Sequence, residues 1–188
     1  MRVSGGSARG RRLRVPKSGV RPTPDRVREA LFSILYDRVA QARVLDLFAG
    51  SGSFGIEALS RGAAQATFVE KNKKTVEILK ENLNTVGLRE DAQVFHTPAD
   101  RAIPKLIALN LGFDICFLDP PYDAGLLEKT LHKLTHSNLP ASGSCIVCEH
   151  HSQAAPPREP TGWSLQQTRS YGDVTVSFYL PNENEEAP

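Results

Sequence analysis

FDICFLDPPY, residues 113–122, is the stretch around which the rest of the chain is arranged. Its apolar run predicts a buried strand, and the two prolines end that strand. We therefore expect Asp119 and Tyr122 at the carboxyl end of a sheet, where open α/β folds keep their ligand crevice. Pro120 and Pro121 have no N–H, so their carbonyls stay free to accept hydrogen bonds. An acid, rigid carbonyls and an aromatic face suit a flat ring that bears an amine. A strand followed by a proline-rich turn, without any binding role, would also explain this sequence.

Predicted strands and helices alternate on both sides of this stretch. Strands are expected over residues 43–47, 66–70, 93–96, 113–118 and 144–149, and helices over 53–61, 72–86, 100–109 and 125–134. This alternation predicts a parallel sheet with helices on both faces. Residues 163–170 and 174–180 flank Tyr171-Gly172-Asp173 and predict a terminal β-hairpin, antiparallel at one edge of the sheet.

The composition is typical of one soluble domain: 188 residues, 40% hydrophobic and 23% charged. The net charge is only +2, but basic residues crowd the N-terminus ahead of the first acid, Asp25, and acids crowd the C-terminus. This asymmetry suggests a basic arm that faces a polyanion. No apolar run reaches the ~20 residues that span a membrane, and no secretory signal is recognisable. Three cysteines make no disulfide framework, which fits a reducing cytoplasm.

The N-terminal segment combines this positive charge with two predicted elements. Residues 2–16 read as two short basic strands joined by a Gly/Ser turn, either a contact for nucleic-acid phosphates or a solvated hairpin. Thr23 can then cap a helix that has Pro24 at its first position. Three arginines lie at or near that helix start, the wrong end for the helix dipole, which hints at a role beyond helix stability: Arg21, Arg26 and Arg28.

A glycine-rich turn, LDLFAGSGSFG at residues 45–55, follows the first predicted strand. Its glycines, Gly50, Gly52 and Gly55, let a backbone approach a ligand at a helix N-terminus. The pattern fits enzymes that use dinucleotides and enzymes that use S-adenosylmethionine. Asp46 helps to separate them, because a carboxylate there would repel a pyrophosphate but suits the cationic amino-acid part of S-adenosylmethionine.

Two more acids follow the next two strands. Glu70 ends the second strand, where an acid can accept hydrogen bonds from both ribose hydroxyls; alternatively it is a surface acid paired with Lys71 or Lys73. Asp100 follows the third strand, at the height where an adenine amine could be read, and a plain helix N-cap is the competing interpretation. Both acids therefore belong to the predicted crevice.

These motifs together resemble a known family. DLFAGSG at residues 46–52 with DPPY at residues 119–122 resembles the two signature motifs of amino-methyltransferases. The opening VSGG and RGR, residues 3–6 and 9–11, and RPTPDRVREALF, residues 21–32, narrow the resemblance to the RsmD-type bacterial methyltransferases. Members of that family methylate the exocyclic N2 of one guanine in 16S ribosomal RNA. The resemblance covers nearly the whole chain.

The resemblance implies a Rossmann-like class I fold dependent on S-adenosylmethionine, with a seven-stranded, mostly parallel sheet and an antiparallel C-terminal hairpin. It also implies an RNA substrate within the small ribosomal subunit. With the residue patterns, it assigns catalysis to Asp119, Pro120, Pro121 and Tyr122. Cofactor binding is assigned to Asp46, Phe48, Gly50, Ser51, Gly52, Glu70, Lys71 and Asp100. RNA contacts are assigned to Arg9, Arg11, Arg12, Arg21, Thr23, Arg26 and Arg28.

We expect three parts: a basic hairpin and loop over residues 1–24, a methyltransferase domain over 25–181 and an acidic disordered tail over 182–188. We expect a monomer in the cytoplasm. No metal site is expected, because Cys145 and Cys148 would point to opposite faces of a strand and so could not bind one metal ion together. Three alternatives stay open: an N6-adenine DNA or RNA methyltransferase, an NAD-dependent oxidoreductase and a non-catalytic RNA-binding module.

Overall fold

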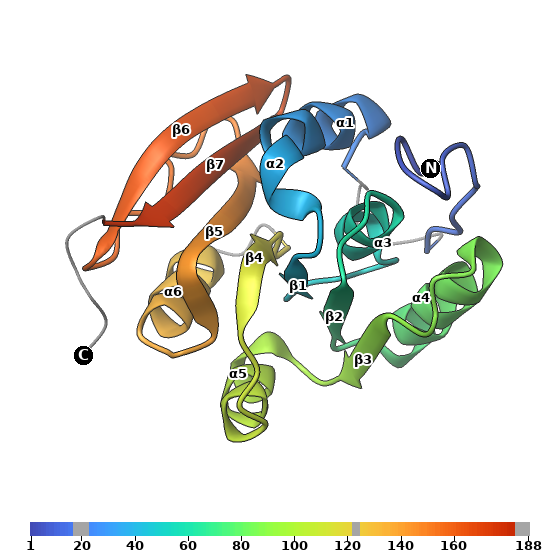
Figure 1. Ribbon diagram of the computed structural model, residues 1–188. Coiled ribbons are helices and arrows are strands. Elements are labelled where there is room, and N and C mark those ends of the chain that lie inside the picture. The colour runs from blue at the N-terminus through green and yellow to red at the C-terminus, as the bar shows by residue number, and fades with distance from the viewer. Residues whose placement is uncertain (17–22, 122–124, 183–188) are drawn as a thin grey trace.

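The computed structural model of the chain describes residues 1–16, 23–121 and 125–182 and shows one sheet flanked by helices (Figure 1). The strands are β1 (Arg43–Asp46), β2 (Gln65–Glu70), β3 (Ala92–His96), β4 (Phe113–Leu118), β5 (Pro140–His151), β6 (Trp163–Tyr171) and β7 (Val174–Pro181). The helices are α1 (Asp25–Ile34), α2 (Tyr36–Val39), α3 (Ser53–Ser60), α4 (Lys73–Val86), α5 (Ala99–Ala108) and α6 (Leu126–Thr135).

The sheet has seven strands in the order β3-β2-β1-β4-β5-β7-β6. The first five of these pair in parallel, and β7 lies antiparallel to both β5 and β6. The predicted fold class is therefore confirmed, including the antiparallel C-terminal hairpin. The chain order reverses between β1 and β4, and the carboxyl ends of these two strands bound the crevice that such sheets use for ligands.

Helices cover both faces of the sheet, as Figure 1 shows. Helices α1, α3 and α4 pack on one face, and α5 and α6 pack on the other. Successive residues of β4 alternate between the two cores: Ile115 and Phe117 face α1 and α3, whereas Cys116 and Leu118 face α5 and α6. Since both faces are covered, the central strands are mostly apolar, and this is why residues 113–118 read as an apolar run that only Asp114 interrupts.

The N-terminal segment differs from the predicted hairpin. One isolated antiparallel bridge, Arg2 with Arg12, and backbone hydrogen bonds such as those from Val3 to Arg11 and from Leu13 to Met1 join its two arms, but neither arm forms a strand. The segment instead folds as turns on α3, where the N–H of Ser7 donates to the carbonyl of Ser60 and the N–H of Ala8 to its hydroxyl. Its apolar side chains, such as Leu13, join the core on the α1 face. Contacts with the main domain therefore add to the few backbone hydrogen bonds between the arms.

The start of α1 also differs from the prediction. Pro24 occupies the N-cap position and no side chain caps the helix. The hydroxyl of Thr23 does not turn back to the helix; it donates to Glu149 at the end of β5, at 2.8 Å. The expectation that Thr23 caps α1 is therefore wrong, because the helix begins one residue later than predicted and the Thr23 side chain is held by a buried carboxylate from a distant strand. Similarly, Pro98 is the N-cap of α5, and Asp100 lies within its first turn.

Candidate active site

A cavity of about 530 Å³ opens at the carboxyl ends of the parallel strands. Its walls come from the loop after β1, the ends of β2 and β4, the start of α5 and the first turns of α6. The predicted site residues among its lining are Thr23, Phe48, Gly50, Ser51, Glu70, Lys71, Asp100, Asp119 and Pro121. Residues from all three predicted groups thus share one cavity.

The glycine loop is fixed by close packing on its far side. Gly52 has a φ of 89°, and a Cβ there would lie 2.3 Å from Leu79 Cδ1. A Cβ at Gly55 would lie 2.2 Å from the ring of Phe68. These two glycines therefore bring α3 against α4 and β2, whereas Gly50 faces the cavity. A side chain at either packing position would push the loop into the ligand space.

Asp46 lies behind this loop and not on the cavity wall. It is 1% exposed, and its Oδ2 accepts a hydrogen bond from the N–H of Gly55 at 3.2 Å. Its Oδ1 has no hydrogen-bond partner among the described residues. Burial raises the pKa of Asp46 to about 7, helped by the charge of Glu70. A buried carboxylate oxygen without a donor favours a cationic or N–H-bearing group next to the loop.

Glu70 ends β2 on the cavity wall. Its Oε2 accepts from the N–H of Gly50 at 3.0 Å, and its Oε1 accepts from the N–H of Asn72 at 2.7 Å. The carboxylate therefore holds the glycine loop and still has lone pairs for two hydroxyl groups. Lys71 and Asp100 lie beside it on the same wall. The arrangement suits a ribose with an adjoining base better than a phosphate.

Asp119 follows β4 and meets a second acid from the neighbouring strand. Leu118 pairs with Cys148, so Asp119 and Glu149 lie side by side, one residue further along β4 and β5. Burial raises the pKa of Asp119 well above its usual value, and the charges of Glu149 and Asp46 raise it further. Burial likewise raises the pKa of Glu149, and the hydrogen bond from Thr23 opposes that effect.

The predicted RNA contacts divide into exposed and buried groups. Arg9, Arg12 and Arg26 are exposed, and no hydrogen bond or ion pair joins the side chain of Arg9 or Arg12 to another described residue. Arg11 is exposed as well, but its guanidinium donates to the carbonyl of Thr85. These four arginines keep positive charge on the surface around the N-terminal segment. Arg21 and Tyr122 lie outside the described residues.

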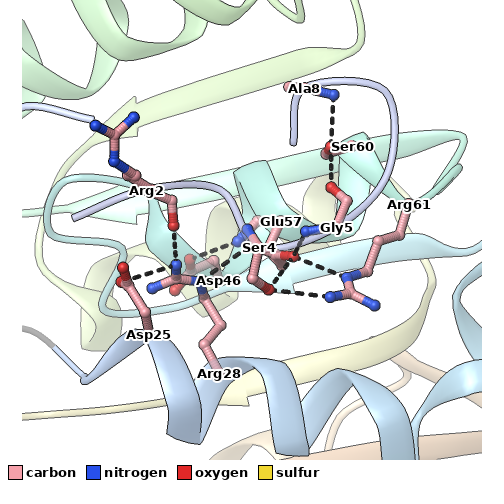
Figure 2. Close-up of polar contacts among 11 residues, drawn as sticks. Arg2, Ser4, Gly5, Ala8, Asp25, Arg28, Asp46, Glu57, Ser60 and Arg61 are labelled. Atoms are coloured by element: carbon pink, nitrogen blue, oxygen red, sulfur yellow. Dashed lines mark hydrogen bonds and ion pairs between the residues drawn. The ribbon is translucent and has the colours of Figure 1, made fainter. Parts of the chain in front are cut away.

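Arg28 departs from the prediction that it contacts RNA. It is 0% exposed, and its Nε donates to Glu57 Oε2 at 3.1 Å (Figure 2). Its Nη2 also contacts the carbonyl of Arg2 and the carboxylate of Asp25. The expectation is corrected because the burial of Glu57 requires a cation, and Arg28 supplies it one turn into α1.

Glu57, on α3, collects five hydrogen bonds and ties the N-terminal segment to the domain (Figure 2). The backbone N–H of Ser4 and of Gly5, the Ser4 hydroxyl, Arg28 and Arg61 all donate to its carboxylate. Burial alone would raise the pKa of Glu57, but these donors and the charge of Arg28 outweigh it and lower the pKa. The network lies on the helix that begins at the glycine loop.

Sequence reasoning missed several residues of the site. Asn82 on α4 donates to the carbonyl of Ser51 and exchanges two hydrogen bonds with the backbone of Arg14. Lys129 and Lys133 line the cavity from one exposed face of α6. No motif marks these positions. The four-residue spacing of the lysines was visible but, without the fold, indicated only a solvated helix face.

The donor set fits S-adenosylmethionine. An unpartnered carboxylate oxygen at Asp46, an acid at the end of β2 and a glycine loop without a basic residue suit a cationic ligand with a ribose and a purine. A pyrophosphate would face the Glu70 carboxylate with like charge. Among the described residues, no cluster of three metal-ligating side chains is present, and Cys145 and Cys148 belong to opposite cores.

Comparison with known proteins agrees with this geometry. The family described as "Conserved hypothetical protein 95" matches residues 1–180. Ribosomal RNA small subunit methyltransferase D of Escherichia coli K12 is 39% identical over 180 residues, 95% of this chain and 89% of that protein. The Haemophilus influenzae protein of the same name is 36% identical over 95% of this chain and 93% of its own length. The solved structure of a hypothetical protein from Thermus thermophilus has a TM-score of 0.83 at 37% identity, over 95% and 98% of the two chains.

None of the helices in the described part of the chain has the length and apolar character needed to cross a bilayer.

Proposed function

We propose that this chain, which belongs to the family described as Conserved hypothetical protein 95, transfers a methyl group from S-adenosylmethionine to the exocyclic N2 of a guanine in small-subunit ribosomal RNA. The observation that carries this proposal is the shared cavity of the glycine loop and Asp119. A carboxylate next to the methyl-donor site can accept hydrogen bonds from the amine that receives the methyl group. The similarity to two proteins named ribosomal RNA small subunit methyltransferase D supports the substrate class.

An exocyclic amine on a purine is a poor nucleophile, because its lone pair is delocalised into the ring. When bound, S-adenosylmethionine supplies an electrophilic methyl group on a sulfonium. The Asp119 carboxylate and the Pro120 carbonyl accept the two N–H groups of the amine and hold the nitrogen closer to pyramidal. Asp119 is then placed to take the proton that the methylated amine loses. Tyr122, outside the described residues, stays a prediction as a stacking partner for the base.

Cofactor binding falls to residues around the glycine loop. Asp46, behind the loop, acts on the cationic part of the cofactor through its unpartnered oxygen, and Glu70 accepts from the ribose hydroxyls. Asp100 and Lys71 lie where the purine and its edge are read, and Phe48, Gly50 and Ser51 form the floor. RNA phosphates meet Arg9, Arg11, Arg12 and Arg26. The target base must be unstacked to enter the cavity. We further propose that the protein acts as a monomer in the cytoplasm.

The decisive experiment measures transfer of tritiated methyl groups to small ribosomal subunits, and to their naked RNA, from a strain that lacks this gene. Wild-type protein should label the RNA on one guanine, located by mass spectrometry of nuclease fragments. Asp119→Ala should abolish transfer while the dissociation constant for S-adenosylmethionine, measured by calorimetry, changes by no more than a few-fold. Transfer by Asp119→Ala at the parent rate would show that the assignment of the amine site is wrong.

Asp119 argues against two of the alternatives. An NAD-dependent oxidoreductase leaves the residues from Asp119 to Pro121 without a role and places Asp46 against a pyrophosphate. A non-catalytic RNA-binding module needs no buried carboxylates at the ends of three adjacent strands. The remaining alternative, an N6-adenine methyltransferase, uses the same kind of amine, so base identity must be decided elsewhere in the cavity.

A further inference from the structure

Thr23 and Glu149 form a buried pair that the chemistry described above does not use. Thr23 lines the cavity and is 4% exposed, and Glu149 is 6% exposed. The Thr23 hydroxyl donates to Glu149 Oε2 at 2.8 Å across 126 residues of sequence. Nothing in the helix that follows requires this bond, because α1 begins without a side-chain cap. Thr23 therefore belongs to the cavity wall, and Glu149, behind it, holds its hydroxyl.

A threonine hydroxyl can donate one hydrogen bond and accept two. An ionised carboxylate can only accept, so Glu149 consumes the single hydrogen of Thr23. What the hydroxyl still offers to the cavity is a lone pair. A threonine without such a partner would rotate its hydroxyl to suit either a donor or an acceptor. Glu149 thus removes that choice.

The position of this lone pair relative to Asp119 follows from the sheet. Asp119 and Glu149 are neighbours at the ends of β4 and β5, and Thr23 is bonded to Glu149. The charged groups that act on Asp119 are Glu149 from β5 and Asp46 from β1. Thr23 and Asp119 both line the cavity, and Glu149 lies beside one and is bonded to the other.

We propose that Glu149 sets the base preference of the site by holding the Thr23 hydroxyl as an acceptor beside Asp119. Such a site takes a base that has a ring N–H on the Thr23 side of its exocyclic amine and rejects one that has a bare ring nitrogen on that side. Guanine has the first arrangement at N2 and N1, and adenine has the second at N6 and N1. Thr23 would touch the base, and Glu149 is a positioning residue. The inference rests on the proposed function and names the specificity device of the same site.

The physical basis is the cost of an unpaired buried group. With guanine, the ring N–H donates to Thr23 while the amine donates to Asp119. With adenine, two lone pairs would face each other, and neither could turn to water inside the cavity. Leaving such a pair unsatisfied is expected to lower transfer about 10- to 100-fold.

The test compares guanine with 2-aminopurine, which keeps the 2-amine but has a bare ring nitrogen in place of N1–H. Each base is placed at the mapped target position of a small-subunit RNA assembled by splinted ligation. Methyl transfer from labelled S-adenosylmethionine is measured well above the pKa of about 7 that burial gives Glu149. Wild-type protein should prefer guanine about 10- to 100-fold.

Four variants separate this role from a structural one. Thr23→Val should reduce the preference to nearly one by slowing transfer to guanine, and Thr23→Ser should restore it. Glu149→Gln should also lower the preference, because its amide can donate to Thr23 and release the hydroxyl hydrogen. The double variant Thr23→Val/Glu149→Gln should match Thr23→Val alone, since Glu149 acts through Thr23. Glu90→Gln, exposed before the amino end of β3, is the matched control and should keep the wild-type preference.

The outcomes separate the two levels of the proposal. Equal wild-type rates on guanine and 2-aminopurine would overturn the role of Glu149 and leave the methyltransferase standing. A preference that survives Thr23→Val would overturn it as well, even if Glu149→Gln fails to fold. Absence of transfer to any small-subunit RNA would instead remove the proposed function on which the inference rests.

Discussion

Asp46, Asp119 and Glu149 bring three buried or half-buried carboxyl groups to the ends of adjacent strands. Burial is the largest cause of the raised pKa of each, and the pKa values of Asp46 and Glu149 rise to about 7. Their mutual repulsion adds to the effect on Asp119. The site therefore opposes full ionisation until a cation or an N–H donor arrives. The unfavourable ionisation of these carboxyl groups lowers the stability of the fold, and perturbed pKa values of this kind are typical of binding sites.

The first consequence is a pH dependence of stability. A carboxyl group whose pKa is raised on folding favours the folded state below its unfolded pKa, and this contribution is lost as the pH rises through the folded pKa. For Glu149 the window runs from about 4.5 to about 7. In urea denaturation, the free energy of unfolding of wild type should fall across this window relative to that of Glu149→Gln. Parallel pH profiles for the two proteins would contradict the prediction.

The second consequence concerns Glu70, which holds the glycine loop and is the proposed acceptor for the ribose hydroxyls. Glu70→Ala should weaken binding of S-adenosylmethionine about 10- to 100-fold, because hydrogen bonds to a charged group are lost. Calorimetry on the purified protein measures the change. Glu90→Ala is the control and should bind like wild type. If Glu70→Ala binds with parental affinity, Glu70 is only a loop anchor.

The N-terminal segment acts through two buried polar residues of the helices beneath it. Glu57 fixes Ser4 and Gly5 on α3, and Asn82 on α4 joins Arg14 to the carbonyl of Ser51 in the glycine loop. Val15 and Pro16, which follow, reach the cavity wall. The segment thus braces the cofactor loop from outside. A basic arm that was expected to serve RNA alone also supports the cofactor site.

The cost of breaking this brace can be measured at Glu57. Glu57→Ala leaves Arg28 buried without its partner, so the free energy of unfolding should fall by about 3–5 kcal/mol. Urea denaturation gives the value, with Glu90→Ala as an exposed control that should change it by less than about 0.5 kcal/mol. If Glu57→Ala lowers the free energy of unfolding no more than Glu90→Ala does, the network does not stabilise the fold.

Across the whole molecule, the arginines that form no internal ion pair leave positive charge on the surface. Arg9, Arg12 and Arg26 are exposed, whereas Arg14 pairs with Glu81 and Arg28 with Glu57. The surface arginines lie on the N-terminal segment and the start of α1, next to elements that line the cavity. Under the proposed function, we expect them to hold RNA while one base enters the site.

Salt dependence tests this surface without knowledge of the target sequence. The dissociation constant for small-subunit RNA should rise with salt, and the variant Arg9→Ala/Arg12→Ala should lower the logarithmic slope by about 1.4 for two phosphate contacts to single strands. Lys105→Ala, in the last turn of α5 and far from the carboxyl ends of the strands, should leave the slope unchanged. An unchanged slope in the double arginine variant would place the RNA elsewhere.

The sequence by itself determined the sheet, the glycine loop and the acids at the strand ends. These features are all short-range: the strand and helix periodicity, the two prolines after Asp119 and the spacing of Gly50, Gly52 and Gly55. Short-range geometry decides which side chains lie at the end of a strand. The predicted order of elements therefore needed small changes of bounds, the addition of the short helix α2 and the removal of the two strands expected within residues 2–16.

Only the tertiary structure decided which polar groups meet. The sequence could not show that Thr23 turns to Glu149, 126 residues away, and not to its own helix. Nor could it show that Arg28 is buried on Glu57 while Arg26 stays exposed, because both occupy the same basic stretch. Hydrogen bonding and burial depend on what the fold brings alongside a residue, and local spacing does not record a partner contributed by a distant element.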